Sequence, residues 1–301
     1  MDQQLTVGFI GLGVMGGPMC RNIALKHPGS VVAFDVNPDA FAILKDTRAE
    51  CAATIAAVGA RADVIFLSLP GGKQVEAVCA EIAPQARPGA TVVDLSTTSV
   101  ETARAVAAKL ADAGIGFADA PVARTREAAQ QGTLSVMVGA PDALYARIRP
   151  LIDMIASDVT HGGGVGTGQV LKLVNNMLVF EHVVVLAEMM AVAERAGVAP
   201  GVLLDAVSKG SGDSFVLRNH GRKAMLPRSF PDKAFPSEYV LKDIGYVLEL
   251  AAASGVKAHA AELTQHYYQQ AVEAGLGGRY FPVVLELIEQ QSKPIAETGK
   301  P

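Results

Sequence analysis

A lysine and two asparagines stand close together in the middle of the chain, in the run Lys172-Leu173-Val174-Asn175-Asn176. Residues three and four apart lie on the same face of a helix, so the three polar groups form one patch near the start of an apolar helical run. Desolvation beside a positive charge lowers the pKa of a lysine, and such a lysine can exchange a proton with a carbonyl or hydroxyl oxygen. We therefore predict that Lys172 is a general acid and base and that Asn175 and Asn176 bind its substrate. The alternative is a lysine that only extends from the helix start into solvent.

A glycine-rich turn stands near the N-terminus, at Gly11-Leu12-Gly13-Val14-Met15-Gly16. It follows an apolar run and opens a helical one, so one glycine can make a tight turn, one can let backbone approach a pyrophosphate, and one can allow close helix packing. Asp35 ends the next apolar run, 19 residues after Gly16, where a carboxylate binds an adenosine ribose. Asp35 repels a 2′-phosphate, and the adjoining Val36 and Asn37 offer no arginine to hold one. The turn and these three residues therefore predict a site for NAD, preferred over NADP.

These groups need a framework of strands, and the first half of the chain alternates short β-branched runs with Ala-rich amphipathic ones. This alternation is typical of βαβ units and a doubly wound, mostly parallel sheet. We expect strands at Leu5–Ile10, Ser30–Phe34, Val64–Leu67, Thr91–Asp94, Gly116–Ala120, Leu134–Val138 and Asp158–His161. We expect helices at Val14–Lys26, Pro38–Arg48, Lys73–Ile82, Val100–Ala113 and Pro141–Met154.

We predict that the second half of the chain is all-helical. Five glycines fall within Gly162–Gly168 and predict a flexible connection, which places the boundary between a Rossmann domain, 1–165, and a helical substrate and dimerisation domain, 166–301. A helical run at Gln169–Ala196 is long enough to bridge the two domains. Further helices are expected at Pro200–Lys209, Phe215–Ala224, Tyr239–Ser254, Ala258–Ala274 and Pro282–Gln291, with a frayed tail from Ser292.

Composition narrows the classes of partner. The chain has 301 residues, 50% hydrophobic, with 26 basic against 30 acidic side chains and a net charge of −4, which argues against a nucleic-acid binder. Its three cysteines lack the spacing of a disulfide framework or a zinc site, and no histidine pair has metal-ligand spacing, so we expect no metal. Among the histidines, only His161, beside the glycine run, is a candidate for a functional role. Met177–Ala193 is apolar but contains Glu181, His182 and Glu188, so we predict a soluble cytoplasmic protein with no membrane span.

Further motifs follow the glycine turn in order: Asp94-Leu95-Ser96-Thr97-Thr98-Ser99, Asp119-Ala120-Pro121-Val122, Gly132-Thr133-Leu134, the lysine run at 172, and Lys242-Asp243. Together they resemble the β-hydroxyacid dehydrogenase family over nearly the whole chain. The resemblance implies an NAD(P)-binding Rossmann domain joined by a long helix to a helical domain, with Lys172 as the catalytic residue. It also implies that Thr97 lies near the nicotinamide ribose and that Lys242 closes over the cofactor. Ser96 is a further candidate substrate ligand, and Leu69 and Pro70, at a strand end, should line the adenosine side.

One segment departs from the family. Where most members read Asp-x-Pro-Val-Ser-Gly-Gly, this chain reads Asp119-Ala120-Pro121-Val122-Ala123-Arg124-Thr125. Ala123 removes a hydroxyl and the next two residues replace glycines, so we expect an anion pocket rebuilt around Ala123, Arg124 and Thr125, in which the guanidinium binds an oxyanion.

This local pattern resembles the sulfolactaldehyde reductase branch of the family, which implies a sulfonate substrate and a 3-sulfolactaldehyde reductase-like activity. A carboxylate remains the alternative, as in a 3-hydroxyisobutyrate dehydrogenase or a succinic or tartronate semialdehyde reductase, because residue type does not separate the two oxyanions. A surface arginine paired with Glu127 is the third reading, and Arg126 receives no role.

The leading prediction is thus an NAD-dependent oxidoreductase acting on a short anionic alcohol or aldehyde. A catalytically silent NAD-binding scaffold and an imine reductase are the alternatives, and Lys172 counts against both, since a scaffold needs no such lysine and imine reductases usually lack it. Long apolar helices in the second half also predict a homodimer or homotetramer.

Overall fold

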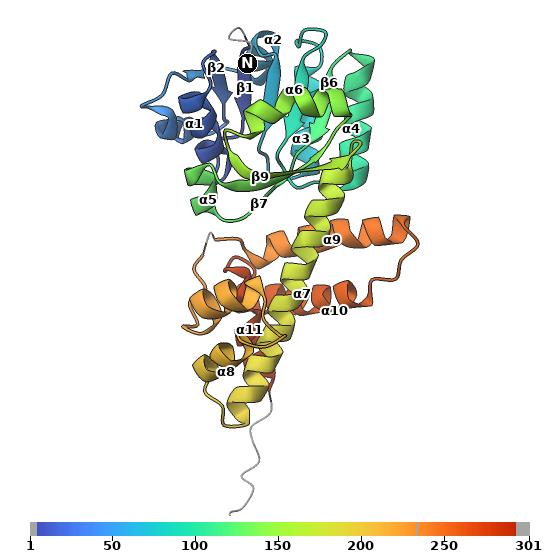
Figure 1. Cartoon of the computed structure of the whole chain (residues 1–301). Coiled ribbons are helices and arrows are strands. Elements are labelled where there is room, and N and C mark those ends of the chain that lie inside the picture. Colours follow the sequence, from blue (N-terminus) through green and yellow to red (C-terminus); the bar gives the residue numbers. More distant parts are fainter. Residues whose placement is uncertain (1–4, 233, 293–301) are drawn as a thin grey trace, which may run out of the picture. The chain divides into compact units, whose positions relative to one another are not determined.

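In the computed structural model, which describes residues 5–232 and 234–292, the first half of the chain forms a nine-stranded sheet (Figure 1). Its strands run in the order β3-β2-β1-β4-β5-β6-β8-β7, with β9 paired to β8. The pairs from β3 to β6 are parallel, as is β8 with β9, whereas β8 is antiparallel to β6 and β7. The strands are β1 (Val7–Ile10), β2 (Val31–Phe34), β3 (Glu50–Cys51), β4 (Val64–Leu67), β5 (Thr91–Asp94), β6 (Gly116–Asp119), β7 (Val122–Ala123), β8 (Leu134–Gly139) and β9 (Ala156–Gly163).

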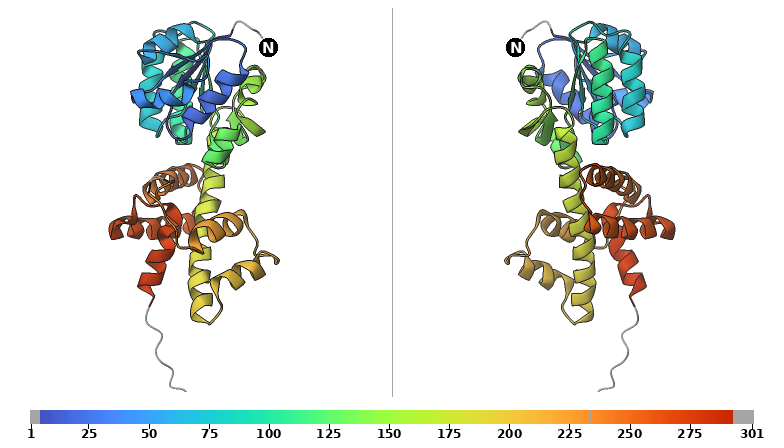
Figure 2. Two further views of the ribbon diagram at one scale, coloured as in Figure 1. Left: turned by 90° about the vertical axis from the view of Figure 1, so that its left-hand side faces the viewer. Right: turned by 90° about the vertical axis from the view of Figure 1, so that its right-hand side faces the viewer.

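Helices cover both faces of this sheet, because the side chains of each strand alternate between two apolar cores (Figure 2). Val64 and Phe66 of β4 share a core with residues of α1 and α6, while Ile65 and Leu67 share the other with residues of α2, α3 and α4. The predicted doubly wound α/β fold is therefore confirmed. The described helices of this unit are α1 (Gly16–Lys26), α2 (Ile55–Arg61), α3 (Gly72–Ile82), α4 (Val100–Asp112), α5 (Arg126–Gln131) and α6 (Asp142–Ile152), with a 3₁₀ helix, η1, at Pro38–Leu44.

The second half of the described chain is helical and has its own core, in which the ring of Phe180 contacts the rings of Tyr268 and Phe281. The chain divides into two compact units, Met1–Lys172 and Leu173–Pro301, so the division falls within α7. The helices are α7 (Thr167–Arg195), α8 (Pro200–Val207), α9 (Ser237–Ala253), α10 (His259–Ala271) and α11 (Val284–Gln291), with π-helical turns η2 (Leu217–Met225) and η3 (Val272–Leu276) and a 3₁₀ turn η4 (Phe281–Val283). The predicted frayed tail lies almost wholly outside the described residues.

Helix α7 is long and apolar enough to span a membrane by length and composition. One face of it, however, carries Met177, Phe180, Val183, Ala187 and Met190, which are buried in the core of the helical unit. A core helix therefore accounts for this hydropathy.

Several segments of the structure differ from the sequence expectations. The predicted helix at Pro38–Arg48 is the 3₁₀ helix η1, which ends early because Thr47 donates to the Leu44 carbonyl through both its amide and its hydroxyl. The segments α2, α5, β3 and β7 were not predicted, since each has only two to seven residues. Predicted helices at Phe215–Ala224 and Ala258–Ala274 contain π-helical turns.

The glycine run at Gly162–Gly168 is ordered structure rather than the expected flexible connection. Strand β9 extends to Gly163 and α7 begins at Thr167. A Cβ at Gly168 would collide with the carbonyl oxygen of Met137, and one at Gly139 would lie too close to the Asp119 carboxylate. These two glycines therefore serve close packing of backbone around Asp119.

Candidate active site

The glycine turn after β1 has the three properties that a dinucleotide site needs. Gly11 has φ +95°, and a Cβ there would collide with the carbonyl oxygen of Ser68. A Cβ at Gly16 would collide with the carbonyl oxygen of Gly11, so this glycine lets α1 start directly against the turn. Around Gly13 there is open space instead, and no side chain caps the start of α1. Backbone N–H groups at a helix start next to open space suit a pyrophosphate.

The carboxylate of Asp35, the residue after β2, accepts hydrogen bonds both from the glycine turn and from the segment that follows β2. Its Oδ2 accepts from the amide of Leu12 at 2.5 Å and its Oδ1 accepts from the amide of Asn37 at 2.7 Å. Both bonds fix the carboxylate beside the turn, and each oxygen keeps a lone pair for a ribose hydroxyl. Val36 and Asn37 are exposed next to it. The residues present therefore fit the adenosine side of a dinucleotide.

The ends of β4 and β5 are joined through Ser96, which is buried. Its Oγ accepts from the amide of Leu69 at 2.9 Å, and its own amide donates to Asp94 Oδ1 at 2.9 Å. The hydroxyl oxygen of Ser96 thus accepts a bond from protein backbone, which makes this residue a link between two strand ends. Leu69 and Thr97 are half-buried at the same edge, and Pro70 is exposed.

The start of α7 is fixed by two buried polar residues, Asp119 at the end of β6 and Gln169 in the first turn. Asp119 Oδ1 accepts from the amide of Gly166 at 2.6 Å and Oδ2 accepts from the amide of Gln169 at 2.8 Å, so the carboxylate caps the helix from another element. Burial raises the pKa of Asp119, and the backbone donors oppose that shift. The Gln169 side chain donates to the carbonyl of Ser96 at 2.9 Å and accepts from the amide of Thr98 at 3.1 Å.

Lys172 lies one turn beyond Gln169 on α7 and is half-buried. Its position is therefore set by Asp119 and Gln169, which tie that turn to the ends of β5 and β6. Neither residue had a predicted role. With α7 beginning at Thr167, Gln169 falls at the third helical position, where glutamine is a common capping residue.

The helical unit contains a row of buried polar groups between α7 and α9. Asn175 Nδ2 donates to Asn176 Oδ1 at 3.2 Å, and Asn176 Nδ2 donates to Asp243 Oδ2 at 2.8 Å. Asp243 is 2% exposed, and its Oδ1 lies 3.1 Å from the ammonium of Lys242. The same ammonium lies 5.2 Å from the ring centroid of Tyr246. Asp243 is therefore a buried carboxyl group that contacts both an asparagine and a lysine, a role that was not predicted from sequence.

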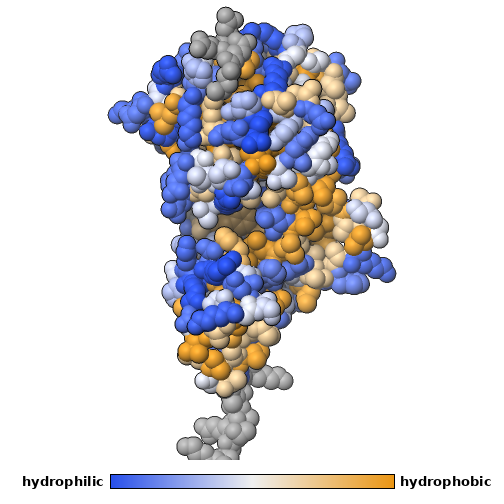
Figure 3. Space-filling view, viewed as in Figure 1, coloured by the Kyte–Doolittle hydropathy of each residue, from blue (hydrophilic) through white to orange (hydrophobic). Residues whose placement is uncertain are grey.

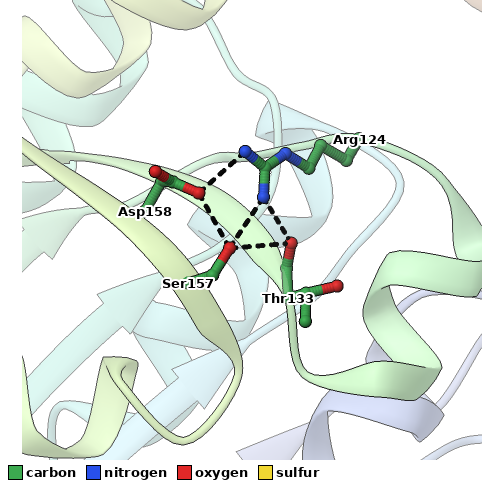
Figure 4. A network of polar contacts seen from close by, with 4 residues as sticks. All are labelled: Arg124, Thr133, Ser157 and Asp158. Carbon is green, nitrogen blue, oxygen red and sulfur yellow. Dashed lines mark hydrogen bonds and ion pairs between the residues drawn. The ribbon is translucent and has the colours of Figure 1, made fainter.

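Arg124 adopts a backbone conformation that favours glycine, with φ +86°. Figure 4 shows its guanidinium turned toward β9. Nη1 donates to the Thr133 carbonyl at 2.7 Å and to Ser157 Oγ at 2.8 Å, and Nη2 donates to Asp158 Oδ2 at 2.7 Å. The bonds from Ser157 and Arg124 lower the pKa of Asp158. The expected surface partner Glu127 instead accepts from Gln131.

The neighbours of Arg124 have local roles. Ala123 ends β7, and Thr125 caps α5 by accepting the amide of Ala128. Arg126 is exposed at the first position of α5. His161 stacks on Tyr145 at a ring distance of 4.1 Å and contacts the Ala140 carbonyl at 2.7 Å, so its ring is held by local packing.

Comparison with known proteins decides the family. Residues 6–163 match the family described as the NAD binding domain of 6-phosphogluconate dehydrogenase, and residues 166–288 match the one described as NAD-binding of NADP-dependent 3-hydroxyisobutyrate dehydrogenase. The 2-(hydroxymethyl)glutarate dehydrogenase of Eubacterium barkeri is 30% identical over 295 residues, with 97% of each chain covered. The chain belongs to the β-hydroxyacid dehydrogenase family.

Two further relatives show the range of this β-hydroxyacid dehydrogenase family. The 2-hydroxy-3-oxopropionate reductase of Escherichia coli is 31% identical, with 83% of this chain and 85% of the relative covered. A structure of Mycobacterium tuberculosis 3-hydroxyisobutyrate dehydrogenase with L-serine superposes with a TM-score of 0.87 at 27% identity, covering 95% of this chain and 99% of the other. The predicted family and enzyme class are confirmed: the chain is an NAD(P)-binding oxidoreductase of the type that acts on hydroxyl groups.

Proposed function

We propose that this β-hydroxyacid dehydrogenase interconverts a short β-hydroxy acid and its aldehyde, with Lys172 as the general acid and base and NAD as the preferred cofactor. The observation that carries the proposal is the double anchoring of α7, since Asp119 and Gln169 hold the turn before Lys172 at the carboxyl ends of β5 and β6. Ligands of open α/β sheets bind at that edge.

In the direction of reduction, the ammonium of Lys172 gives a proton to the carbonyl oxygen of the substrate; in oxidation, the neutral amine takes the hydroxyl proton. When bound, the dinucleotide supplies or accepts the hydride. Asn176, one helical turn further along α7, donates one amide hydrogen to Asp243 and keeps a second for the substrate oxygen. Asn175 holds that amide in place through its bond to Asn176 Oδ1.

Within the first unit, the cofactor would be held by the glycine turn, Asp35, Leu69 and Thr97; the role of Lys242 rests on the family resemblance alone. The carboxylate of Asp35, fixed by the amides of Leu12 and Asn37, supports NAD rather than NADP because a 2′-phosphate would meet a negative charge.

For the substrate anion, a carboxylate is the better-supported choice. The guanidinium of Arg124 makes three bonds to its own chain and its charge is balanced by Asp158, whereas a bound sulfonate would have to replace that partner. A 3-sulfolactaldehyde reductase-like activity is the second candidate, and the Pro-Val-Ala-Arg-Thr segment at 121–125 favours it.

The test of the catalytic assignment is Lys172→Ala beside Lys109→Ala, which changes an exposed lysine of α4. We expect kcat of Lys172→Ala to fall roughly 10²- to 10⁴-fold while NADH binding, followed by fluorescence, is retained. Lys172→Arg should not restore turnover, because a guanidinium does not deprotonate in this pH range. Wild-type turnover in Lys172→Ala would refute the assignment.

The substrate assignment is tested with 3-hydroxyisobutyrate, 2-(hydroxymethyl)glutarate, tartronate semialdehyde, succinic semialdehyde and 3-sulfolactaldehyde. If Arg124 only holds its loop, Arg124→Ala and Asp158→Ala should change KM equally for all of them. If it binds a sulfonate, Arg124→Ala should raise KM for 3-sulfolactaldehyde alone, and Asp158→Ala should not.

The chain is also proposed to act as a homo-oligomer in the cytoplasm. Cys20, Cys51 and Cys79 are unpaired with one another, which suits a reducing compartment. Apolar side chains exposed on the helical unit suit self-association (Figure 3).

A further inference from the structure

Four residues form a closed polar network on the carboxyl side of the sheet (Figure 4). We call it the Arg124 network; it consists of Arg124, Thr133, Ser157 and Asp158. Strand β6 ends at Asp119, which pairs with Gly139 at the end of β8. Because β8 runs antiparallel to β6, the start of β8, next to Thr133, extends about 16 Å past this carboxyl edge. The network therefore lies on the side of the sheet where ligands of open α/β folds bind.

The side chain of Arg124 crosses the start of β8. Ser135 of β8 pairs with Ala123 of β7 on one side and with Asp158 of β9 on the other. Arg124 follows Ala123, and its Nη2 reaches across to Asp158 Oδ2 at 2.7 Å. The ion pair thus ties together two strands that are each paired with β8.

The backbone at Arg124 does not favour an arginine. At φ +86° a residue with a Cβ is strained, whereas glycine adopts this conformation freely. The three hydrogen bonds of the guanidinium offset the strain, and all three go to the other members of the Arg124 network. What favours arginine at this position is therefore the guanidinium and its partners, not the turn.

The Arg124 network holds two opposite charges within reach of a ligand. Ser157 Oγ donates to Asp158 Oδ2 at 2.8 Å, so this carboxylate oxygen accepts from both the serine and the guanidinium. The two bonds lower the pKa of Asp158, which keeps its carboxylate ionised at neutral pH. The side chains of Arg124 and Asp158 are 43% and 60% exposed, so an incoming anion meets both charges and not a free cation.

We propose that Asp158 is a specificity-determining residue that excludes substrates with a second anionic group. A free guanidinium on this side of the sheet would bind a second carboxylate. Asp158 instead neutralises Arg124 and repels the additional negative charge. The substrate class is thereby narrowed to short β-hydroxy acids with one carboxylate and an uncharged remainder. The inference deepens the proposed function and rests on it.

An ion pair that only ties strands together would act on all substrates alike, so the test compares two substrates that differ in one charge. They are 2-(hydroxymethyl)glutarate and its half-amide, in which the distal carboxylate is replaced by an uncharged amide of similar size. We expect kcat/KM of the wild-type enzyme to favour the half-amide roughly tenfold or more. Asp158→Asn keeps the shape and removes the charge, so this preference should fall roughly tenfold. Asp153→Asn, in the exposed ion pair with Arg149, is the matched control and should leave the preference unchanged.

A second variant shows whether the change acts through the guanidinium. Arg124→Gly suits the observed backbone conformation and removes the side chain. Alone, it leaves Asp158 without its cation, so the preference for the half-amide should rise. Combined with Asp158→Asn, it should abolish most of the gain for the dicarboxylate, because no free guanidinium is left to bind it.

Binding without turnover separates this inference from the proposed function. Glutarate and its half-amide lack the hydroxymethyl group and cannot be oxidised, and their Kd for the complex of enzyme and NADH is measured by calorimetry. Asp158→Asn should tighten glutarate relative to the half-amide roughly tenfold. This result would support the role of Asp158 even if neither hydroxymethyl compound were turned over.

Three results would overturn the role of Asp158. They are a wild-type enzyme that accepts the dicarboxylate as well as the half-amide, no gain in glutarate binding by Asp158→Asn, and a gain that persists in the double variant with Arg124→Gly. Asp158→Ser serves as a second uncharged variant in case Asp158→Asn does not fold, and the same three outcomes apply to it.

Discussion

Asn176 of α7 donates a 2.8 Å hydrogen bond to the buried carboxylate of Asp243 on α9. This bond decides which way the asparagine amide points, because the oxygen of that amide accepts from Asn175 and its nitrogen faces Asp243. A residue proposed to touch substrate is thus oriented by an anion on another helix of the same unit.

The Asn176–Asp243 bond should appear as energetic coupling in a double-mutant cycle. Asn176→Ala and Asp243→Ala each leave a buried polar group unpaired, so we expect a coupling free energy of about 1–3 kcal/mol, measured by urea unfolding of the two single variants and the double one. The exposed pair Arg149–Asp153 is the matched comparison and should give about 0.5 kcal/mol. Additive effects at Asn176 and Asp243 would show that the bond does not hold the amide.

The cap on α7 should be sensitive to a change of one atom. Asp119→Asn keeps the shape but turns one acceptor into a donor that faces a backbone N–H, so unfolding free energy should fall by about 1–3 kcal/mol. Asp142→Asn changes an exposed carboxylate in the first turn of α6 and serves as the control. Equal denaturation midpoints for Asp119→Asn and wild type would contradict the capping role.

Cofactor choice should depend on Asp35. Asp35→Asn retains an acceptor for the backbone but removes the negative charge, so the ratio of kcat/KM for NAD to that for NADP should fall roughly 10- to 100-fold. Asp39→Asn, an exposed carboxylate four residues later, should leave the ratio unchanged. A wild-type enzyme that already prefers NADP would refute this prediction at once.

The free energy of unfolding should fall with acid because of one half-buried histidine, His220. His220 contacts the Tyr280 hydroxyl at 2.7 Å, and burial, with the nearby Lys223, lowers the pKa of His220 to about 4 from its usual value near 6.5. Between these pH values the unfolded chain binds a proton that the folded chain does not, so unfolding free energy drops as pH falls through that window, by at most about 3 kcal/mol. His220→Gln should flatten the slope between pH 6.5 and 4 in urea titrations. A parallel profile for variant and wild type would assign the acid loss to other groups.

The parts of the fold that followed from sequence are those with strong local patterns. The runs at Val64–Leu67 and Thr91–Asp94 were predicted with their observed bounds. The first is apolar throughout, as strands buried on both faces are, and the second has a β-branched run that ends in an aspartate. The glycine turn and Asp35 were recognisable because a turn, a helix start and an acid must occur in that order.

What the sequence did not reveal depends on contacts between distant segments. The sequence around Gln169 does not predict that its side chain hydrogen-bonds to Ser96 and Thr98, which stand more than 70 residues earlier. Arg124 was predicted to bind a substrate oxyanion, with an ion pair to the nearby Glu127 as an alternative. Its partner in the chain is instead Asp158, which lies far along the sequence and beside Arg124 only because β9 pairs with β8. The glycines around Gly168 were predicted to form a flexible linker, whereas in the structure they allow segments of backbone to lie close together. Both situations favour glycine, so composition alone does not distinguish them.

The anchoring of α7 also sets an order of events during synthesis. Its first turn is bonded through Gln169 to Asp119 and Ser96, which precede Gln169 by 50 and 73 residues. The acceptors that receive α7 therefore leave the ribosome before the helix does, and the start of α7 can settle as soon as it emerges. The remaining turns must wait for partners such as Asp243, 67 residues downstream of Asn176. The helix is thus completed from its N-terminal end, and an early stop in translation would leave its apolar faces uncovered.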